Sequence, residues 1–311
     1  MKKNWSRVLN IAPFSRFIYL VDFINRLFPG YQQFVIPWLM WDHQVFSRCN
    51  YAHLYFTAPE KLKGEIGIRN LGIPENAPFI CFHTRDSRYL NTIMPGANFY
   101  YHNFRDCSIN NYIPAVDELT KKGYFAIRMG AAVKDPIVTA NPMIIDYATK
   151  FRSDFMDIYL SVNCKFFIGC CSGIDEIPKI FRKAPVLAVN FVPIKALCYA
   201  GPIKLFIPKK LWLKKEKRLL TFREIIDSDI VGFNRSEVYE KHGIEVIENT
   251  PEEITSAVLE MEAMVSGEWQ ANKEEEALQQ RFWSLSNNIF DGIILPRIGT
   301  EFLRQSKELL T

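Results

Sequence analysis

The chain has 311 residues, of which 48% are hydrophobic and 23% charged, and its formal net charge is +4 at neutral pH. This composition is that of a globular protein long enough for one large or two modest domains. So small a net charge does not favour nucleic-acid binding, and no apolar run approaches the roughly 20 residues that a membrane-spanning helix needs. The seven cysteines have no CxxC spacing, which argues against a disulfide framework or zinc ribbon and favours a reducing, cytoplasmic location.

Residues 1–75 are expected to form a helical, aromatic-rich N-terminal region. Between residues 14 and 28, apolar side chains recur at helical spacing, and Pro29-Gly30 ends this amphipathic helix. The first thirty residues carry the cations Lys2, Lys3, Arg7, Arg16 and Arg26 against one acid, Asp22. Such a helix can lie weakly on an anionic membrane. Burial of its stripe, Phe14, Phe17, Ile18 and Val21, against the next domain is the favoured expectation.

From about residue 76, strand and helix patterns alternate along the chain. Strands are expected at 79–83, 124–128, 143–146, 165–169, 186–190 and 244–248, and helices at 110–122, 154–162, 174–183, 251–265 and 270–287. This alternation predicts an α/β fold with a parallel sheet covered on both faces. We expect a Rossmann-like domain over residues 76–265, with residues 266–311 as C-terminal helices packing back on its core.

One stretch interrupts this alternation. Residues 191–221 contain three prolines and a basic run at 209–218. A solvated loop is the default interpretation of such a run. A docking surface for phosphate or lipid head groups is the alternative.

The strand at 79–83 is followed by a polar cluster that contains His83, Arg85 and Asp86. Ligands of parallel sheets bind at the carboxyl ends of the strands, and a guanidinium binds phosphate oxygens in a bidentate way. Arg85 is therefore a candidate phosphate ligand and His83 a second donor-binding residue. The structural alternatives are a salt bridge of Arg85 to a carboxylate such as Asp86, and a core position for His83.

A second cluster follows the strand at 165–169, where Ser172 and Gly173 form a turn ahead of a helix. A hydroxyl with unhindered backbone N–H groups can bind an anion, although an N-cap without a ligand has the same pattern. Arg128 ends another strand and would add a guanidinium on the ligand side. Asp157, on the helix before the strand, is a candidate acceptor for a ribose or base, or merely a solvated helix residue.

These motifs resemble the fucosyltransferase group of GT-B enzymes, which includes the core, Nod-factor and protein O-fucosyltransferases. The matching positions are His83-x-Arg85 and the series Asp157, Ile158, Leu160, Ser161, Lys165, Phe166, Ile168 and Ser172. The resemblance implies that Arg85 and the Ser172 turn bind the diphosphate of GDP-fucose. Two departures are Gly173, where the group has a second serine, and an N-terminal half of only about 75 residues.

A wider pattern resembles a bacterial glycosyltransferase family of surface-polysaccharide clusters. Its marks are Phe82-His83-x-Arg85-Asp86, Ile127–Gly130, Arg152–Ile158, Leu220–Ile225 and Ile298-Gly299-x-x-Phe302-Leu303. The resemblance implies a GT-B-like arrangement with a reduced N-terminal region. It implies inverting, metal-independent sugar transfer from a nucleotide diphosphate, preferably a GDP-sugar, to a surface-glycan acceptor, which is commonly lipid-linked. No cofactor is expected, and Asp86 is the carboxylate nearest in sequence to serve as base.

Two other functions stay open at this stage. A polysaccharide pyruvyl transferase has a similar fold and uses a phosphate-bearing donor, phosphoenolpyruvate. A degenerate transferase that serves as a scaffold in glycan assembly would account for the short N-terminal half. The presence of His83, Arg85 and Ser172 together argues against the scaffold.

Overall fold

The computed structural model describes residues 21, 23–30, 52, 54–198, 202–286, 289–290 and 295–311. The chain divides into two compact units, Met1–Asp42 and His43–Thr311. Among the helices of the described residues, none is both long enough and apolar enough to cross a lipid bilayer.

In the first unit, residues 21 and 23–25 are helical and a turn follows at 26–30. Gly30 has a φ of 82°, a left-handed conformation that glycine adopts without strain and that suits the end of a helix. Val21 and Ile24 are 49% and 44% exposed. Phe14, Phe17 and Ile18 lie outside the described residues, so burial of the stripe and its contact with lipid both stay predictions.

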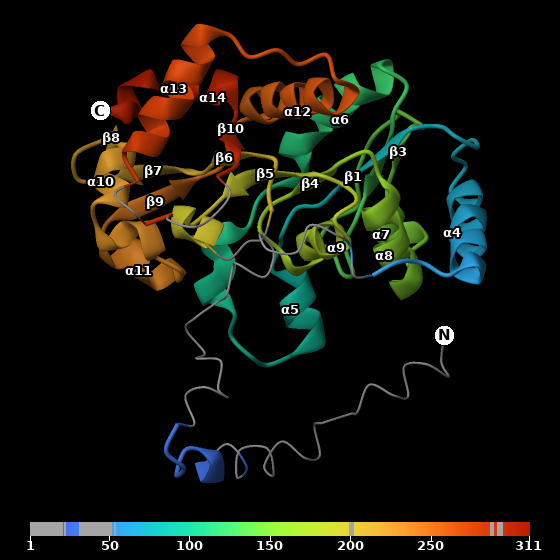
Figure 1. Cartoon of the computed structure of the whole chain (residues 1–311), viewed down its shortest axis with the longest axis horizontal. Helices are drawn as coiled ribbons and strands as arrows, with labels where there is room; N and C mark the ends of the chain where they lie inside the picture. Colours follow the sequence, from blue (N-terminus) through green and yellow to red (C-terminus); the bar gives the residue numbers. More distant parts are fainter. Residues whose placement is uncertain are drawn as a thin grey trace. The chain divides into compact units, whose positions relative to one another are not determined.

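The second unit is built on a seven-stranded sheet in which every neighbouring pair is parallel, as the alternating pattern predicts (Figure 1). The strands, in their order across the sheet, are β10 (Arg297–Ile298), β6 (Leu205–Pro208), β5 (Val186–Phe191), β4 (Phe167–Gly169), β1 (Phe79–Phe82), β2 (Phe125–Arg128) and β3 (Ile144–Ile145). The series β3-β2-β1-β4-β5-β6 is the doubly wound, Rossmann-type order. It reverses direction between β1 and β4, where such sheets bind ligands.

Helices cover both faces of this sheet. The described helices of this unit are α4 (Ala58–Asn70), α5 (Arg88–Ile93), α6 (Ile113–Lys121), α7 (Tyr147–Lys150), α8 (Asp154–Asn163), α9 (Glu176–Phe181), α10 (Phe222–Ile226), α11 (Ser236–Lys241), α12 (Pro251–Ser266), α13 (Lys273–Ser284) and α14 (Thr300–Gln305). Single 3₁₀ turns include η3 (Tyr100–Arg105), η4 (Ile109–Tyr112), η5 (Gly173–Asp175), η6 (Ile194–Cys198), η7 (Asp229–Gly232) and η8 (Lys307–Leu310).

Alternate residues of β1 enter two separate cores. Ile80 and Phe82 of β1 pack in the core that contains residues of α6, α12, α13 and α14, whereas Phe79 and Cys81 pack in the core beneath α7 and α8. Figure 1 shows these two helix groups on opposite sides of the sheet. Burial on both faces explains why the strands read as continuous apolar runs.

A smaller antiparallel sheet, in the order β8-β7-β9, stands beside the main one. It contains β7 (Lys210–Leu213), β8 (Arg218–Leu219) and β9 (Ile244–Ile247). The strand expected at 244–248 therefore exists, but it is antiparallel and lies outside the main sheet. The stretch expected to be irregular contains β6, β7 and β8. Within the basic run, Lys209 is buried and Lys210 pairs with Glu253 at 2.6 Å, so only residues 214–217 form an exposed turn.

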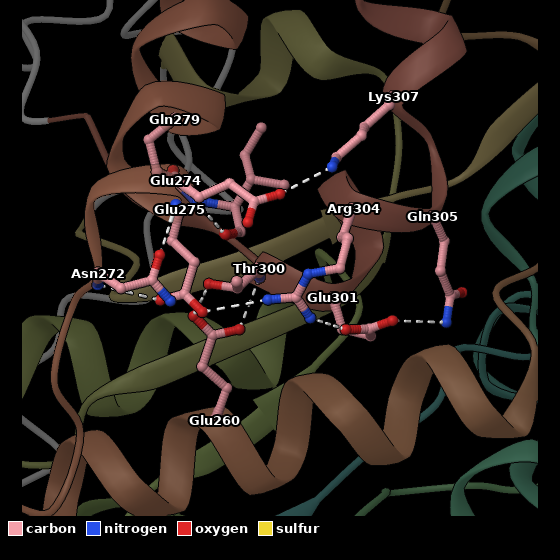
Figure 2. Close-up of polar contacts among 11 residues, drawn as sticks. Glu260, Asn272, Glu274, Glu275, Gln279, Thr300, Glu301, Arg304, Gln305 and Lys307 are labelled. Atoms are coloured by element: carbon pink, nitrogen blue, oxygen red, sulfur yellow. Dashed lines mark hydrogen bonds and ion pairs between the residues drawn. The ribbon is translucent and has the colours of Figure 1, made fainter.

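The C-terminal segment completes the main sheet rather than only covering it. β10 joins the edge strand β6, and Gln279 of α13 binds both outward backbone groups of Ile298 (Figure 2). The Gln279 amide donates to the Ile298 carbonyl at 2.6 Å and accepts from the Ile298 N–H at 3.1 Å. Both carboxylate oxygens of Glu260 on α12 accept from Thr300, one from its N–H and one from its hydroxyl, each at 2.7 Å. The parallel sheet thus extends past the expected domain boundary at residue 265.

Candidate functional site

A cavity of about 480 Å³ opens at the carboxyl edge of the sheet, beside the switch between β1 and β4. Its walls come from residues 83–86, 89 and 90 after β1, from His102 and Arg105 of η3, from 130–132 after β2, from Arg152 and Asp157, and from 172–174 and Ile177 after β4. Volumes of this size are typical of small-molecule sites. All the site residues predicted from sequence line this cavity except Arg128.

Arg85 is held at the base of the cavity by its backbone and by one side of its guanidinium. The residue is 8% exposed, and its backbone N–H donates to the Cys170 thiol at 3.0 Å. Nη1 donates to the carbonyl of His102 at 3.2 Å and pairs with Asp106. Nη2 is buried and has no hydrogen-bond partner among the described residues. A buried charged donor without a partner is costly, so this geometry favours an anion at Nη2.

Arg105 brings a second guanidinium to the same cavity. Its Nη2 donates to Nδ1 of His102 at 3.0 Å and its Nη1 to the carbonyl of Cys171 at 3.5 Å. Its Nε is buried and, within the described part of the chain, unbonded; Arg105 has no carboxylate partner there either. Burial, and then the charge of Arg105, lower the pKa of Arg85 to about 10, which leaves the Arg85 guanidinium charged at neutral pH.

Hydrogen bonds from Lys209 and Ser236 hold the η3 segment that contains His102 and Arg105 in place. The buried ammonium of Lys209 donates to the carbonyls of Phe104 and Asp106 at 3.1 and 2.6 Å. The hydroxyl of Ser236 accepts from the N–H of Phe104 at 3.0 Å and donates to the Tyr100 carbonyl at 2.9 Å. These bonds hold Asp106 and His102 in place, and through them Nη1 of Arg85.

Asp86 lies in the cavity wall, but both of its carboxylate oxygens are engaged. Oδ1 accepts from the N–H of Arg88 at 2.8 Å, and Oδ2 accepts from the N–H of Lys134 at 3.0 Å. The side chain therefore ties the start of α5 to the loop after β2. This bonding is that of a loop anchor, and the role of Asp86 as a base stays a prediction.

In the turn after β4, Ser172 serves as an N-cap, which was the alternative to anion binding. Its N–H and its hydroxyl donate to the two carboxylate oxygens of Asp175, each at 2.9 Å, so neither donor is free for a phosphate. Asp175 fits because Gly169 has no side chain: a Cβ there would lie 2.4 Å from the carboxyl group. A Cβ on the exposed Gly173 would meet nothing within 4 Å. The two arginines are thus better placed than Ser172 to bind an anion.

Arg128 and Asp157 are both buried and engaged by protein groups. Arg128 lies outside the cavity, is 2% exposed, and binds the Asp146 carboxylate at 3.4 Å and the Asp135 carbonyl at 2.5 Å. Asp157 accepts from Tyr147 at 2.8 Å and from Arg152 at 3.0 and 2.9 Å. Burial raises the pKa of Asp157. The donor-binding role expected for Arg128 has no support in this placement.

His102 and Arg105 were not predicted from the sequence, although a signal for them exists. His102-Asn103-Phe104-Arg105-Asp106 has the residue types of His83-Thr84-Arg85-Asp86 with one position inserted. The two segments cross-pair, because Arg85 of the first binds Asp106 of the second. The repetition of His, Arg and Asp in these two segments is thus the sequence pattern from which a site with two arginines could have been predicted.

A search of protein-family models, curated proteins and solved structures finds no match to the chain. The functional assignment therefore depends on the geometry of the cavity and on the motifs. In the described part of the chain, no three His, Cys, Asp or Glu side chains gather as they would around a metal ion. The Asp227-Ser228-Asp229 sequence does not line the cavity.

Proposed function

We propose that the chain is a glycosyltransferase that moves a sugar from a nucleotide diphosphate to a hydroxyl of a bacterial surface glycan. A GDP-sugar is the favoured donor, the transfer inverts the anomeric carbon, and no metal is needed. The observation that supports this proposal best is the pair of guanidinium groups of Arg85 and Arg105 at the switch point of the sheet, each of which has one buried nitrogen without a hydrogen-bond partner among the described residues. Two such groups match the two phosphates of a nucleoside diphosphate.

The chemistry of the transfer gives these arginines their role. As the bond between the sugar and the diphosphate breaks, negative charge develops on the leaving phosphate. Fixed N–H donors aimed at that charge stabilise the transition state without having to reorganise. Lys209 and Asp106 hold the donors in place before the substrate arrives. A GT-B-like arrangement, with the N-terminal region on the acceptor side, is part of this proposal.

A thermal-shift screen separates this function from its alternatives. The wild-type chain is heated with GDP, UDP, inorganic diphosphate or phosphoenolpyruvate. A ligand at about a hundred times its Kd adds about 2.7 kcal/mol of stability, which raises the Tm of a chain of this size by about 4 °C. We expect GDP to give the largest shift and inorganic diphosphate a smaller one.

Three results, two from this screen and one from a transfer assay, would contradict the proposal. Stabilisation by phosphoenolpyruvate, and not by either nucleotide, would support a pyruvyl transferase. Binding of a nucleotide without transfer to any glycan acceptor would support a scaffold. A shift that persists in the Arg85→Ala variant would place the nucleotide outside this cavity.

A further inference from the structure

Two histidines line the cavity, and the hydrogen bond of each fixes its neutral tautomer. Nδ1 of His83 lies 3.0 Å from the backbone carbonyl of Met129. A carbonyl oxygen can only accept, so Nδ1 carries the proton of the neutral ring. Nε2 is then an unprotonated acceptor, and it has no partner among the described residues. His83 therefore presents a proton acceptor to a ligand.

His102 has the opposite arrangement. Its Nδ1 lies 3.0 Å from Nη2 of Arg105, and a guanidinium can only donate. Nδ1 is therefore the acceptor, and the proton of the neutral ring is on Nε2. Burial, followed by the charges of Arg105, Arg85 and Arg235, lowers the pKa of His102 to about 4, which keeps the ring neutral at pH 7. His102 thus presents a proton donor.

Both histidines line the cavity together with Arg85. His83 precedes it by two residues at the end of β1, and the His102 carbonyl accepts from Nη1 of Arg85 at 3.2 Å. The cavity therefore combines an acceptor histidine, a donor histidine and an anion-binding guanidinium. Sites that carry out acid and base steps at one pH hold their titratable groups in different states in this way. Asp86 is less suited to the base role, because a proton on either oxygen would disturb a loop-anchoring bond.

We propose that Nε2 of His83 is the general base that activates the acceptor hydroxyl, and that Nε2–H of His102 donates a hydrogen bond to the leaving diphosphate. This inference rests on the transferase function proposed above. As the acceptor oxygen forms its bond to the anomeric carbon, its proton passes to His83. The bond between that carbon and the diphosphate oxygen breaks, and the electron pair leaves with the diphosphate. Arg85, Arg105 and His102 stabilise that charge, and His83 later releases its proton to water.

The tautomers can be measured without any activity. Long-range ¹H–¹⁵N spectra of the full chain labelled with ¹⁵N-histidine report which ring nitrogen carries the proton. His83→Asn and His102→Asn assign the two rings among the five histidines, and His242→Asn is the control. We expect the proton of His83 on Nδ1 and that of His102 on Nε2 at pH 7. Inorganic diphosphate should shift the His102 signals more than those of His83. The same tautomer on both rings would overturn the proposal.

The transfer reaction tests the roles. His83→Asn is the sharp variant, because its amide N–H can replace the Nδ1 bond to Met129 while the base is lost. We expect its kcat to fall by about 10²–10⁴-fold, the usual range for a general base, with GDP binding within about twofold of wild type. Asp86→Asn should cost less. A His83→Asn enzyme within tenfold of wild type, or a larger loss in Asp86→Asn, would refute the base assignment. A wild-type chain that transfers no sugar would refute the proposed function itself, whatever the tautomers are.

Discussion

The two ends of the unit His43–Thr311 use buried polar groups in opposite ways. At the junction of α12, α13 and α14, Gln279 and Glu260 have every side-chain oxygen or amide group bonded to Ile298 or Thr300 (Figure 2). At the cavity, Arg85 and Arg105 each keep a buried N–H group without a partner in the described part of the chain. The polar side chains of the junction are fully bonded, whereas one guanidinium nitrogen of each cavity arginine is not.

A buried group without a hydrogen bond does not by itself mark a binding site. Arg297 and Glu276 near β10 also have buried unbonded atoms, but their charges lie 2.7 Å apart as an ion pair. Arg85 also pairs with Asp106, but the neighbouring Arg105 adds a second positive charge that lowers the pKa of Arg85, and among the described residues Arg105 has no carboxylate partner. Binding of an anion would offset this charge and bond the free nitrogens, which is why the comparison predicts different effects for substitutions at the two ends.

The largest effect is expected for Arg85→Ala. Removal of a fixed donor to the developing charge should cost about 3–4 kcal/mol in transition-state stabilisation, which is roughly a 10²–10³-fold loss of kcat. Arg85→Lys should not restore activity, because an ammonium lacks the planar fork. Transfer assays and the GDP-induced thermal shift measure both variants. Arg304→Ala is the matched control, since Arg304 also pairs with carboxylates but at the exposed junction. Near-normal transfer by folded Arg85→Ala would remove this residue from the site.

Gln279→Leu should give the largest loss of stability and leave ligand binding unchanged. The leucine leaves the outward N–H and carbonyl of the buried Ile298 without partners, and each such group costs about 1–3 kcal/mol. Urea denaturation should show a loss of about 2–6 kcal/mol for the two groups together. Gln305→Leu makes the same chemical change on the exposed surface of α14 and should alter stability by less than about 0.5 kcal/mol. Equal losses in the two variants would mean that Gln279 does not complete the sheet edge.

Alanine substitutions at two glycines near the turn after β4 distinguish a role of this turn in packing from a role in ligand binding. Gly169→Ala would place a methyl group 2.4 Å from the buried Asp175 carboxyl. Overpacking of this kind costs about 1–3 kcal/mol, and the displaced Asp175 would release Ser172. Gly173→Ala has open space and should change stability by less than about 0.5 kcal/mol. Thermal melts with and without inorganic diphosphate test both. Loss of the diphosphate shift in Gly173→Ala alone would show that this turn contacts the ligand.

The sequence indicated the cavity edge because burial and periodicity are local properties. Fully apolar runs predicted β1, β4 and β5, and residues that directly follow β1 and β4 in a parallel sheet must meet at one edge. The gathering of His83, Arg85 and Ser172 in one cavity follows from this geometry.

The pairing of side chains across the fold was not predictable in the same way. Arg128 also ends a strand, but Asp146 at the end of neighbouring β3 binds it, and nothing in either segment specifies that pair. Arg105 lies in the short turn η3, which has no periodicity. β10 has only two residues, and its place in the sheet depends on Gln279 and β6 rather than on its own pattern.

The pH dependence of the stability of Thr300→Val tests whether the Thr300 hydroxyl stabilises the ionised form of Glu260. Burial raises the pKa of Glu260, while the Thr300 hydroxyl and N–H act against that rise. A carboxyl with a raised folded-state pKa favours folding fully below its unfolded value of 4.5 and loses that contribution as pH rises through the folded value. Without the hydroxyl the pKa rises further, so the variant should lose about 1–2 kcal/mol at pH 7 and less at pH 4. A loss that is equal at both pH values would separate Thr300 from the ionisation of Glu260.

The smallest effect is expected from removal of metal ions. In many phosphate-transfer sites a divalent cation neutralises the leaving group. In the proposed mechanism this charge comes instead from Arg85, Arg105 and His102, which line the cavity. EDTA should therefore leave both the GDP-induced thermal shift and the rate of transfer unchanged, and added Mg²⁺ or Mn²⁺ should not raise the rate of Arg85→Ala. The second measurement is the sharper one, because a cation that restores activity to that variant would show that a metal can replace the arginine. An absolute requirement of the wild-type chain for either ion would contradict charge stabilisation by side chains alone and the metal-independent transfer that we propose.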